Sequence, residues 1–171
     1  MGNPRRNGSV PGSANRNLYT EEQRRRRDAS RWTLVQGILA PAQFVVFLVS
    51  LYLVINFLHT GDGYLAATIS VVTKTVILYA IMITGSLWEK DVFDRYLFAP
   101  AFFWEDVVSM LVMVLHTLYV AVVILGFANA TTQMIIALVA YVFYVINAAQ
   151  YIIKFRMVRN TSTPAAAGHS A

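Results

Sequence analysis

The chain has 171 residues, of which 57% are hydrophobic and only 13% are charged. A water-soluble domain is normally about 45–50% apolar and about 25% charged, so this composition favours a one-domain integral membrane protein. The sequence has no cysteine, which excludes a disulfide framework, a thiolate metal site and a cysteine nucleophile. Membrane topology explains the net charge of +5 better than nucleic-acid binding does, because the arginines flank apolar segments.

The N-terminal region divides into two parts. Residues 1–17 are rich in Gly, Asn, Pro, Ser and Arg, and this composition predicts a disordered tail. Residues 18–31 form a basic segment in which Thr20 is the expected N-cap of a short helix, with Gln23 at the capping-box position. The four consecutive arginines of this segment are expected to lie on the cytoplasmic membrane surface, where anionic headgroups attract them.

Four apolar segments follow, and each is long enough to cross the hydrocarbon core of a bilayer, which takes about 20 residues. The segments run from Trp32 to Leu58, from Tyr64 to Trp88, from Glu105 to about Phe127 and from Thr132 to Ile153. The first is a retained span, because its apolar run exceeds the roughly 7–15 residues of a signal-peptide core. Together they predict a transmembrane domain over residues 32–158, and residues 159–171 are expected to form a second disordered tail.

The distribution of positive charge predicts the orientation of this domain. Eight arginines precede the first apolar segment, Lys90 and Arg95 follow the second, and three basic residues follow the fourth. The other two loops have no Lys or Arg. Because cytoplasmic loops carry the excess of basic residues, the sequence predicts an all-α integral membrane protein with four transmembrane helices and both termini in the cytoplasm.

Each apolar segment contains a polar side chain near the predicted midplane. These residues are Gln43, Lys74, His116 and Asn147. An ionisable side chain in hydrocarbon costs about 2.5–3.5 kcal/mol on insertion scales, so its presence needs a reason. One interpretation is that the four groups form hydrogen bonds between helices and fix their packing. The other is that they form the polar floor of a ligand cavity, which Lys74 favours because no carboxylate lies at its depth.

Acidic residues gather at the expected cytoplasmic edge. Five of the nine lie there: Glu89, Asp91, Asp94, Glu105 and Asp106. The helix macrodipole favours carboxylates in a first helical turn, which is a purely structural explanation. Glu105 and His116 lie about 20° from the same helical face, whereas Asp106 points about 100° away from Glu105. We therefore expect one acid of this pair to face the cavity, where an apolar boundary favours the protonated form that a general acid needs.

Aromatic residues crowd the same edge. They include Trp88, Tyr96, Phe98, Phe102, Phe103 and Trp104. An interfacial aromatic belt is one explanation, and a flat apolar entrance for a large planar ligand is the other. Asn147 and Gln150 share a helical face, as do Gln36 and Gln43. The sequence has no Gly-rich phosphate loop and no His pair with metal-ligand spacing, so these residues alone predict a helical membrane protein with a polar interior.

Four stretches resemble a known family. They are Arg25–Pro41 (RRRDASRWTLVQGILAP), Thr84–Lys90 (TGSLWEK), Phe98–Asp106 (FAPAFFWED) and Asn147–Gln150 (NAAQ). From roughly Leu18 to Val158 the chain is similar to the chlorophyllide 3-vinyl hydratases, also called 2-vinyl bacteriochlorophyllide hydratases, of phototrophic bacteria. The resemblance implies a hydro-lyase of bacteriochlorophyll biosynthesis in the bacterial inner (cytoplasmic or intracytoplasmic) membrane. It implies chlorophyllide a as substrate and no redox cofactor.

The implied reaction adds water across the C3 vinyl group of chlorophyllide a and leaves a 1-hydroxyethyl group. It needs a proton donor at the terminal vinyl carbon and a base that holds water, and such groups typically contribute about 10²–10⁴-fold. Glu105 is the first candidate for the donor, and Asp106 or Glu89 for the base. His116 is a candidate for a proton relay or for an axial ligand of the substrate's magnesium. The candidates for substrate binding are Lys74 (with a substrate carboxylate or carbonyl), Trp88, Phe103, Trp104, Gln43, Asn147 and Gln150.

Two other functions are compatible with the same residues. A non-catalytic tetrapyrrole carrier or pigment-assembly protein needs the cavity and the aromatic residues but no acid. A proton or ion pathway built on Lys74 and His116 is weakened by the absence of carboxylates deep in the apolar segments. The expected partners are the pigment and the lipid bilayer, and not nucleic acid. A lone four-helix bundle is narrow for a tetrapyrrole, which favours a homo-oligomer such as a dimer, or a lipid-facing groove. Other pigment-biosynthesis enzymes are further candidate partners.

Overall fold

The computed structural model describes residues 18–161, with side chains as far as Arg156, and the regular structure in this range is entirely helical. Its elements are α1 (Glu21–Ala29), α2 (Arg31–Thr60), α3 (Tyr64–Phe93), α4 (Phe103–Leu125) and α5 (Ala130–Thr161). The all-helical prediction is confirmed. The predicted N-terminal tail lies outside the described residues. Of the predicted C-terminal tail, residues 159–161 belong to α5, and residues 162–171 lie outside the described residues.

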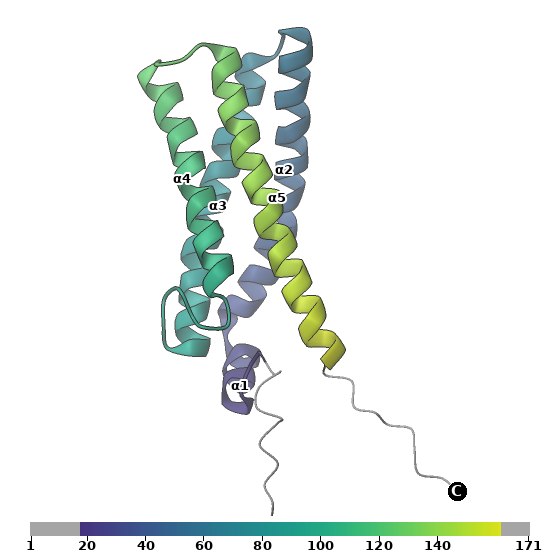
Figure 1. The fold of residues 1–171 in the computed structure, drawn as a ribbon, viewed down its shortest axis with the longest axis vertical. Helices are drawn as coiled ribbons and strands as arrows, with labels where there is room; N and C mark the ends of the chain where they lie inside the picture. Colours follow the sequence, from purple (N-terminus) through teal and green to yellow (C-terminus); the bar gives the residue numbers. More distant parts are fainter. Residues whose placement is uncertain (1–17, 162–171) are drawn as a thin grey trace, which may run out of the picture.

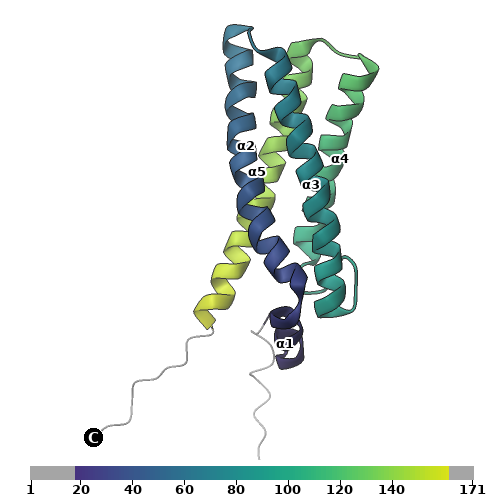
Figure 2. The same ribbon diagram turned by 180° about the vertical axis from the view of Figure 1, so that it is seen from behind.

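The four long helices form one bundle in which each helix runs antiparallel to the next (Figures 1 and 2). The most extensive contacts are those of α2 with α3 and of α4 with α5, so the bundle consists of two packed helical hairpins. We call one end the α1 end, because it carries α1, the connection between α3 and α4, and the C-terminal end of α5. The opposite turn end carries the two short connections at residues 61–63 and 126–129.

Local sequence signals determine where the helices begin and end. Thr20 caps α1 in a complete capping box, because its hydroxyl accepts from the Gln23 amide while the Gln23 side chain accepts from the Thr20 amide. Gly61 and Gly126 end α2 and α4 with φ of 81° and 66°, a left-handed conformation that glycine adopts without a steric penalty. These two glycines permit the tight turns that hold each hairpin antiparallel.

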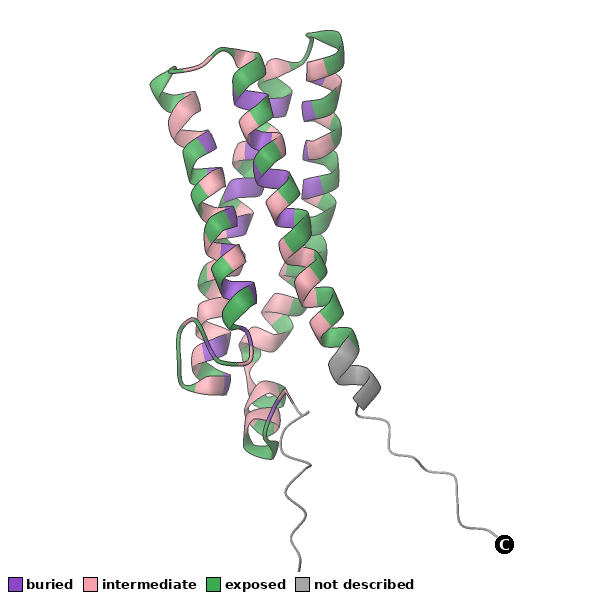
Figure 3. Ribbon diagram, in the orientation of Figure 1, coloured by how far each residue is buried: buried purple, intermediate pink, exposed green. Residues whose placement is uncertain are grey.

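The outer surface of the bundle is apolar. The four long helices are each long and apolar enough to cross a membrane. Buried residues form an inner stripe along each helix, and exposed residues surround it (Figure 3). The exposed side chains include Ile124 and Leu65, which are 76% and 70% accessible. Apolar patches this extensive are rare on soluble monomers, and this surface is suited to the apolar interior of a membrane.

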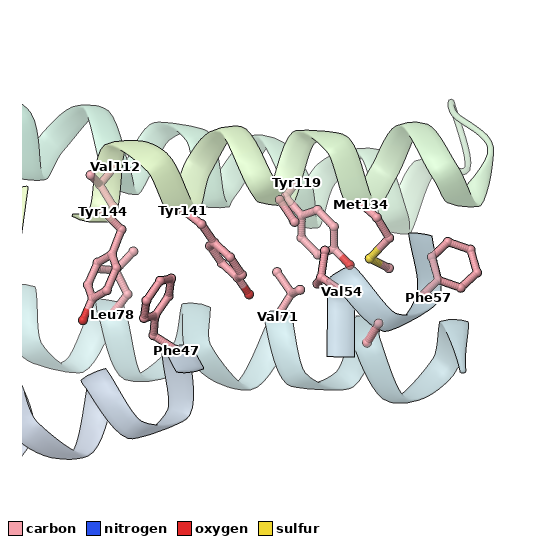
Figure 4. Packing of buried hydrophobic residues seen from close by; sticks show 12 residues of the cluster. Phe47, Val54, Phe57, Val71, Leu78, Val112, Tyr119, Met134, Tyr141 and Tyr144 are labelled. Carbon is pink, nitrogen blue, oxygen red and sulfur yellow. The ribbon is translucent and has the colours of Figure 1, made fainter. Parts of the chain in front are cut away.

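The half of the bundle toward the turn end has a closed core. Its cluster of buried side chains includes Val54, Val71, Tyr119, Met134 and Tyr141, contributed by all four long helices (Figure 4). Polar groups in this half are paired between helices, since Ser50 of α2 bonds to Tyr141 of α5 and Tyr64 of α3 donates to Gln133 of α5. Such pairs fix the rotation of each helix about its axis.

The α1 end is closed by a second, aromatic cluster. Tyr19, Val92 and Phe102 are its most buried members, and Trp88, Phe93 and Tyr151 pack against them. Two polar contacts attach α1 to α3: Arg26 forms an ion pair with Asp94 at 2.5 Å, and the Ser30 hydroxyl donates to Asp91 at 2.7 Å. Tyr19, the residue before the N-cap of α1, therefore covers the end of the bundle.

Candidate active site

A cavity of about 670 Å³ lies in the half of the bundle toward the α1 end. Ligand pockets typically have volumes of about 300–1,000 Å³. All four long helices line it, together with Tyr19 and Arg27. Its lining residues extend from Leu78 to Glu89 on α3 and from Tyr144 to Phe155 on α5. Each of these intervals covers eleven residues, which corresponds to a length of about 16 Å along the bundle axis.

Two features create this space. First, α2 and α5 diverge toward the α1 end (Figures 1 and 2), and small residues on facing helices, such as Gly37, Gly85 and Ala148, leave the gap between them unfilled. Second, Pro41 lies within α2 and has no backbone N–H, so the Gly37 carbonyl four residues earlier receives no helical hydrogen bond. Both residues line the cavity, which therefore has a backbone acceptor available on its α2 wall.

The inner end of the cavity, farthest from α1, is bounded by one residue from each long helix: Gln43, Leu78, Val112 and Tyr144. Gln43 is 2% exposed, and neither its side-chain oxygen nor its nitrogen has a hydrogen-bond partner. Among the residues whose side chains are described, it is the one that leaves two buried polar atoms unpaired. A buried amide without partners is costly, so this group marks a position that a polar ligand atom can satisfy.

Two carboxyl groups lie together at the opposite end of the cavity. Glu89 and Asp106 both line it, are 5% and 2% exposed, and accept from the backbone amides of consecutive residues, Ala99 and Phe98, which places them side by side. Two neighbouring acids repel each other when both are ionised, so their adjacency favours a state in which one of them keeps its proton. The arrangement supplies a proton donor and an acceptor at one place.

The same two acids hold the connection between α3 and α4. The backbone amide of Phe98 donates to Asp106 at 2.8 Å, and that of Ala99 donates to Glu89 at 3.2 Å. Phe98 has φ of 60°, which is strained for a bulky residue, and backbone strain of this kind is concentrated at functional sites. The Tyr151 hydroxyl also donates to Asp106, at 3.4 Å. These contacts fix the position of both carboxyl groups.

One helical turn deeper than Asp106, a polar pair faces the same cavity. The Asn147 amide donates to the Ser109 hydroxyl at 3.0 Å and to the Glu105 backbone carbonyl at 3.0 Å. Ser109 and Asn147 both line the cavity. Because Ser109 follows Asp106 by three residues, the hydroxyl and the carboxyl lie on one face of α4.

Glu105, unlike the adjacent Asp106, does not line the cavity. Its carboxylate forms an ion pair with Lys154 at 2.6 Å. Of the two adjacent acids, Asp106 lines the cavity, whereas Glu105 contacts the neighbouring helix α5. Glu105, the first candidate for the proton donor, instead joins α4 to α5.

Lys74 and His116 contact each other in the closed half, outside the cavity lining. The Lys74 ammonium lies 2.9 Å from Nε2 of His116, whose Nδ1 lies 2.8 Å from the Val112 carbonyl. Because Nδ1–H donates to that carbonyl, Nε2 is the acceptor. The ammonium also lies 4.0 Å from the ring centroid of Tyr144 and 5.2 Å from that of Tyr141, which is cation–π geometry. Both imidazole nitrogens are therefore occupied, and neither is free to ligate a substrate's magnesium.

The other candidate residues divide between the cavity and the outside of the bundle. Trp88 lines the cavity, and its indole N–H donates to the Thr33 hydroxyl at 2.9 Å. Phe103 and Trp104 are 44% and 69% exposed and are not part of the lining. Gln150 is also absent from the lining. Five sequence candidates thus meet at the cavity: Gln43, Trp88, Glu89, Asp106 and Asn147.

Several lining residues were not among the sequence candidates. Tyr19 precedes the N-cap of α1, the position from which an apolar residue commonly packs onto the helix it introduces, and this signal was available in the sequence. Burial raises the pKa of Tyr19 to about 12, which keeps its hydroxyl neutral. The Arg27 guanidinium lies 5.1 Å from the Tyr19 ring centroid. Tyr144 and Tyr151 had no such signal, because tyrosines recur around α5.

Comparison with known proteins identifies the family of the chain. The chain matches the family model for 2-vinyl bacteriochlorophyllide hydratase over residues 19–157. It is 60% identical to the 2-vinyl bacteriochlorophyllide hydratase of Cereibacter sphaeroides, over 87% of this chain and 92% of that protein. It is 61% identical to the protein of the same name from Rhodobacter capsulatus, over 83% of this chain and 82% of that protein. No solved structure matches the chain. The chain therefore belongs to the 2-vinyl bacteriochlorophyllide hydratase family.

Proposed function

We propose that this protein is a hydratase that adds water to the C3 vinyl group of chlorophyllide a and forms the 3-(1-hydroxyethyl) product during bacteriochlorophyll biosynthesis. The substrate class follows from the names of the family and of its curated relatives. The observation that carries the proposal is the adjacency of Glu89 and Asp106 at one end of a largely apolar cavity. An apolar cavity suits the flat macrocycle, and the acids suit the chemistry of its alkene.

The carboxyl pair performs the proton transfers. One carboxyl protonates the terminal vinyl carbon, and the positive charge left on the inner carbon is delocalised into the conjugated macrocycle. A water molecule adds to that inner carbon and returns a proton to the pair, which ends in its starting state. Glu89 is our choice for the donor and Asp106 for the base. Asp106 accepts at both carboxyl oxygens, from Tyr151 and Phe98, as suits an ionised group, and Ser109 follows it on the same helical face. Positioned acid–base groups of this kind contribute about 10²–10⁴-fold.

Residues around the pair hold the reacting groups. Ser109 and Asn147 have a hydroxyl and an amide with which to orient the water. Trp88 and Tyr151 flank the acids and provide aromatic surface for the edge of the macrocycle. Lys74, His116 and Glu105 have structural roles in this proposal, because each is paired away from the cavity.

We further propose that all four long helices span the bacterial inner membrane with the α1 end in the cytoplasm. Lysine and arginine residues cluster at this end, and the two connections of the turn end have none. Since the chain has no cysteine, single cysteines can report the orientation. We expect Arg95→Cys to react with a membrane-impermeant maleimide only from the cytoplasmic side, and Asp62→Cys only from the opposite side. The reverse labelling pattern would reject this orientation.

The activity is tested with purified protein in detergent or nanodiscs and 3-vinyl chlorophyllide a. Mass spectrometry of the extracted pigment should show a product heavier by one water, and the label should be incorporated when the reaction is run in ¹⁸O-water. A carrier protein would bind the pigment, detected as a shift in its absorbance, without forming this product. Binding without conversion by folded protein would therefore replace the hydratase with a carrier.

A further inference from the structure

The unpaired amide of Gln43 and the carboxyl pair lie at opposite ends of one cavity. The distance between these two ends along the bundle follows from the alignment of α2 with α3. Two hydrogen bonds fix that alignment: Gln36 donates to Thr84, and Ser50 bonds to Ser70. Gln43 is halfway between Gln36 and Ser50, which places it level with the midpoint between Thr84 and Ser70. That midpoint is twelve residues from Glu89, or about 18 Å along α3.

The substrate has its polar and reactive groups on opposite sides of its ring. Its vinyl group is on ring A, and the keto group of the fifth, isocyclic ring lies across the macrocycle from it. We propose that the Gln43 amide N–H donates a hydrogen bond to this keto oxygen, so that the ring lies lengthwise in the cavity with its vinyl arm at Glu89 and Asp106. This inference rests on the proposed function and adds to it the orientation of the substrate.

The environment of Gln43 distinguishes this role from a packing role. A glutamine that fixes helix packing has partners in the empty protein, as Gln133 does with Tyr64 and Ala128. Gln43 has none, so its replacement by leucine removes no hydrogen bond and should leave the empty protein at least as stable. The loss should appear only when the pigment is bound.

The test compares two pigments with two variants. The pigments are 3-vinyl chlorophyllide a and its analogue in which the isocyclic keto group is replaced by methylene. Binding is measured from the absorbance shift, which requires no turnover, and hydration is measured separately. The wild-type protein should bind the keto pigment about tenfold more tightly than the analogue, as expected for one hydrogen bond in a desolvated site. Gln43→Leu should bind both pigments equally, with the affinity that the wild-type protein has for the analogue.

Gln133→Leu is the matched control, because it makes the same substitution in a glutamine of the closed half. It should keep the full preference for the keto pigment. An unchanged preference in Gln43→Leu would overturn the inference, whatever its effect on stability. Failure of the wild-type protein to hydrate a pigment that it binds would reject the proposed function instead. The two failures are therefore distinguishable.

Discussion

The two halves of the bundle are built from the same four helices, but they differ in how their buried polar groups are paired. In the half toward the turn end, several polar side chains are paired between helices, as in Ser50 with Tyr141 and Lys74 with His116. The unpaired hydroxyls of Thr68 and Tyr119 in that half face each other and do not line the cavity.

In the half toward α1, the Gln43 amide, the Tyr19 hydroxyl and the Gln150 side-chain oxygen have no partner, and of these residues Gln43 and Tyr19 line the cavity. Both halves contain polar groups that are costly to bury. We infer that an unpaired group that lines the cavity, such as the Gln43 amide, takes its partner from the contents of the cavity, whereas the paired groups of the closed half take theirs from another helix.

The largest effect should come from the acid pair. In Asp106→Asn the amide oxygen can still accept from Phe98, but the side chain can neither donate nor accept the catalytic proton. Turnover should therefore fall about 10²–10⁴-fold, and pigment binding should be retained. Initial rates by mass spectrometry measure this loss. Glu105→Gln is the control, because it weakens the Lys154 ion pair without changing the cavity, and it should lower stability more than turnover. A larger loss of turnover in Glu105→Gln would reverse the roles that we assign.

In the closed half, the contact between Lys74 and His116 should affect stability. His116→Leu leaves a buried ammonium without its acceptor and should reduce the free energy of unfolding by about 3–5 kcal/mol. Lys74→Met removes the charge and leaves only a neutral imidazole nitrogen unpaired, so its cost should be smaller, about 1–3 kcal/mol. Denaturant unfolding in mixed micelles measures both. If either variant kept its stability and lost pigment binding, Lys74 and His116 would belong to the site.

An alanine-to-leucine substitution in each half distinguishes an open cavity from a packed core. Ala148→Leu puts bulk into the cavity, so it should leave stability unchanged and weaken pigment binding at least tenfold. Ala137→Leu puts the same bulk into the closed core, where the residue is fully buried, and should destabilise the protein by about 1–3 kcal/mol. Thermal unfolding and pigment titration are the measurements. Equal destabilisation by both would show that the cavity is filled by side chains in the working protein.

The smallest effect concerns the two glutamines in the absence of pigment. Gln133→Leu removes hydrogen bonds to Tyr64 and Ala128 and should cost about 0.6–1.7 kcal/mol, the range measured between membrane helices. Gln43→Leu should cost nothing or stabilise slightly, because it buries an apolar group in place of an unpaired amide. Thermal unfolding of both variants without pigment tests the difference. Destabilisation by Gln43→Leu would mean that its amide already has a partner.

The sequence was sufficient for the bundle because its signals are local. The four long apolar segments and the capping box at Thr20 predicted where the helices lie, and these elements were confirmed as helices. The second apolar segment was predicted to end at Trp88, whereas α3 continues five residues further, to Phe93. Contacts from α1 to Asp91 and Asp94 hold this extension, and no local pattern reports them.

The site was only partly predictable, because it depends on how each helix is rotated against its neighbours. Helical spacing separated Glu105 from Asp106 by about 100° but did not show which of them Lys154 would engage. Lys74 and His116 were placed at one depth, yet depth alone did not reveal that they contact each other. For Gln43, polarity within an apolar segment left both helix packing and a ligand cavity open as interpretations. Its lack of a partner required the packed structure.

The most direct test is a structure of the slow Asp106→Asn variant with 3-vinyl chlorophyllide a bound. We expect the macrocycle between α2 and α5, with its vinyl carbon in contact with the side chains at positions 89 and 106 and its isocyclic ring toward Gln43. A pigment whose alkene arm lay against the lipid-facing surface, or at the opposite end of the bundle, would contradict the assignment of hydration to this pair of acids.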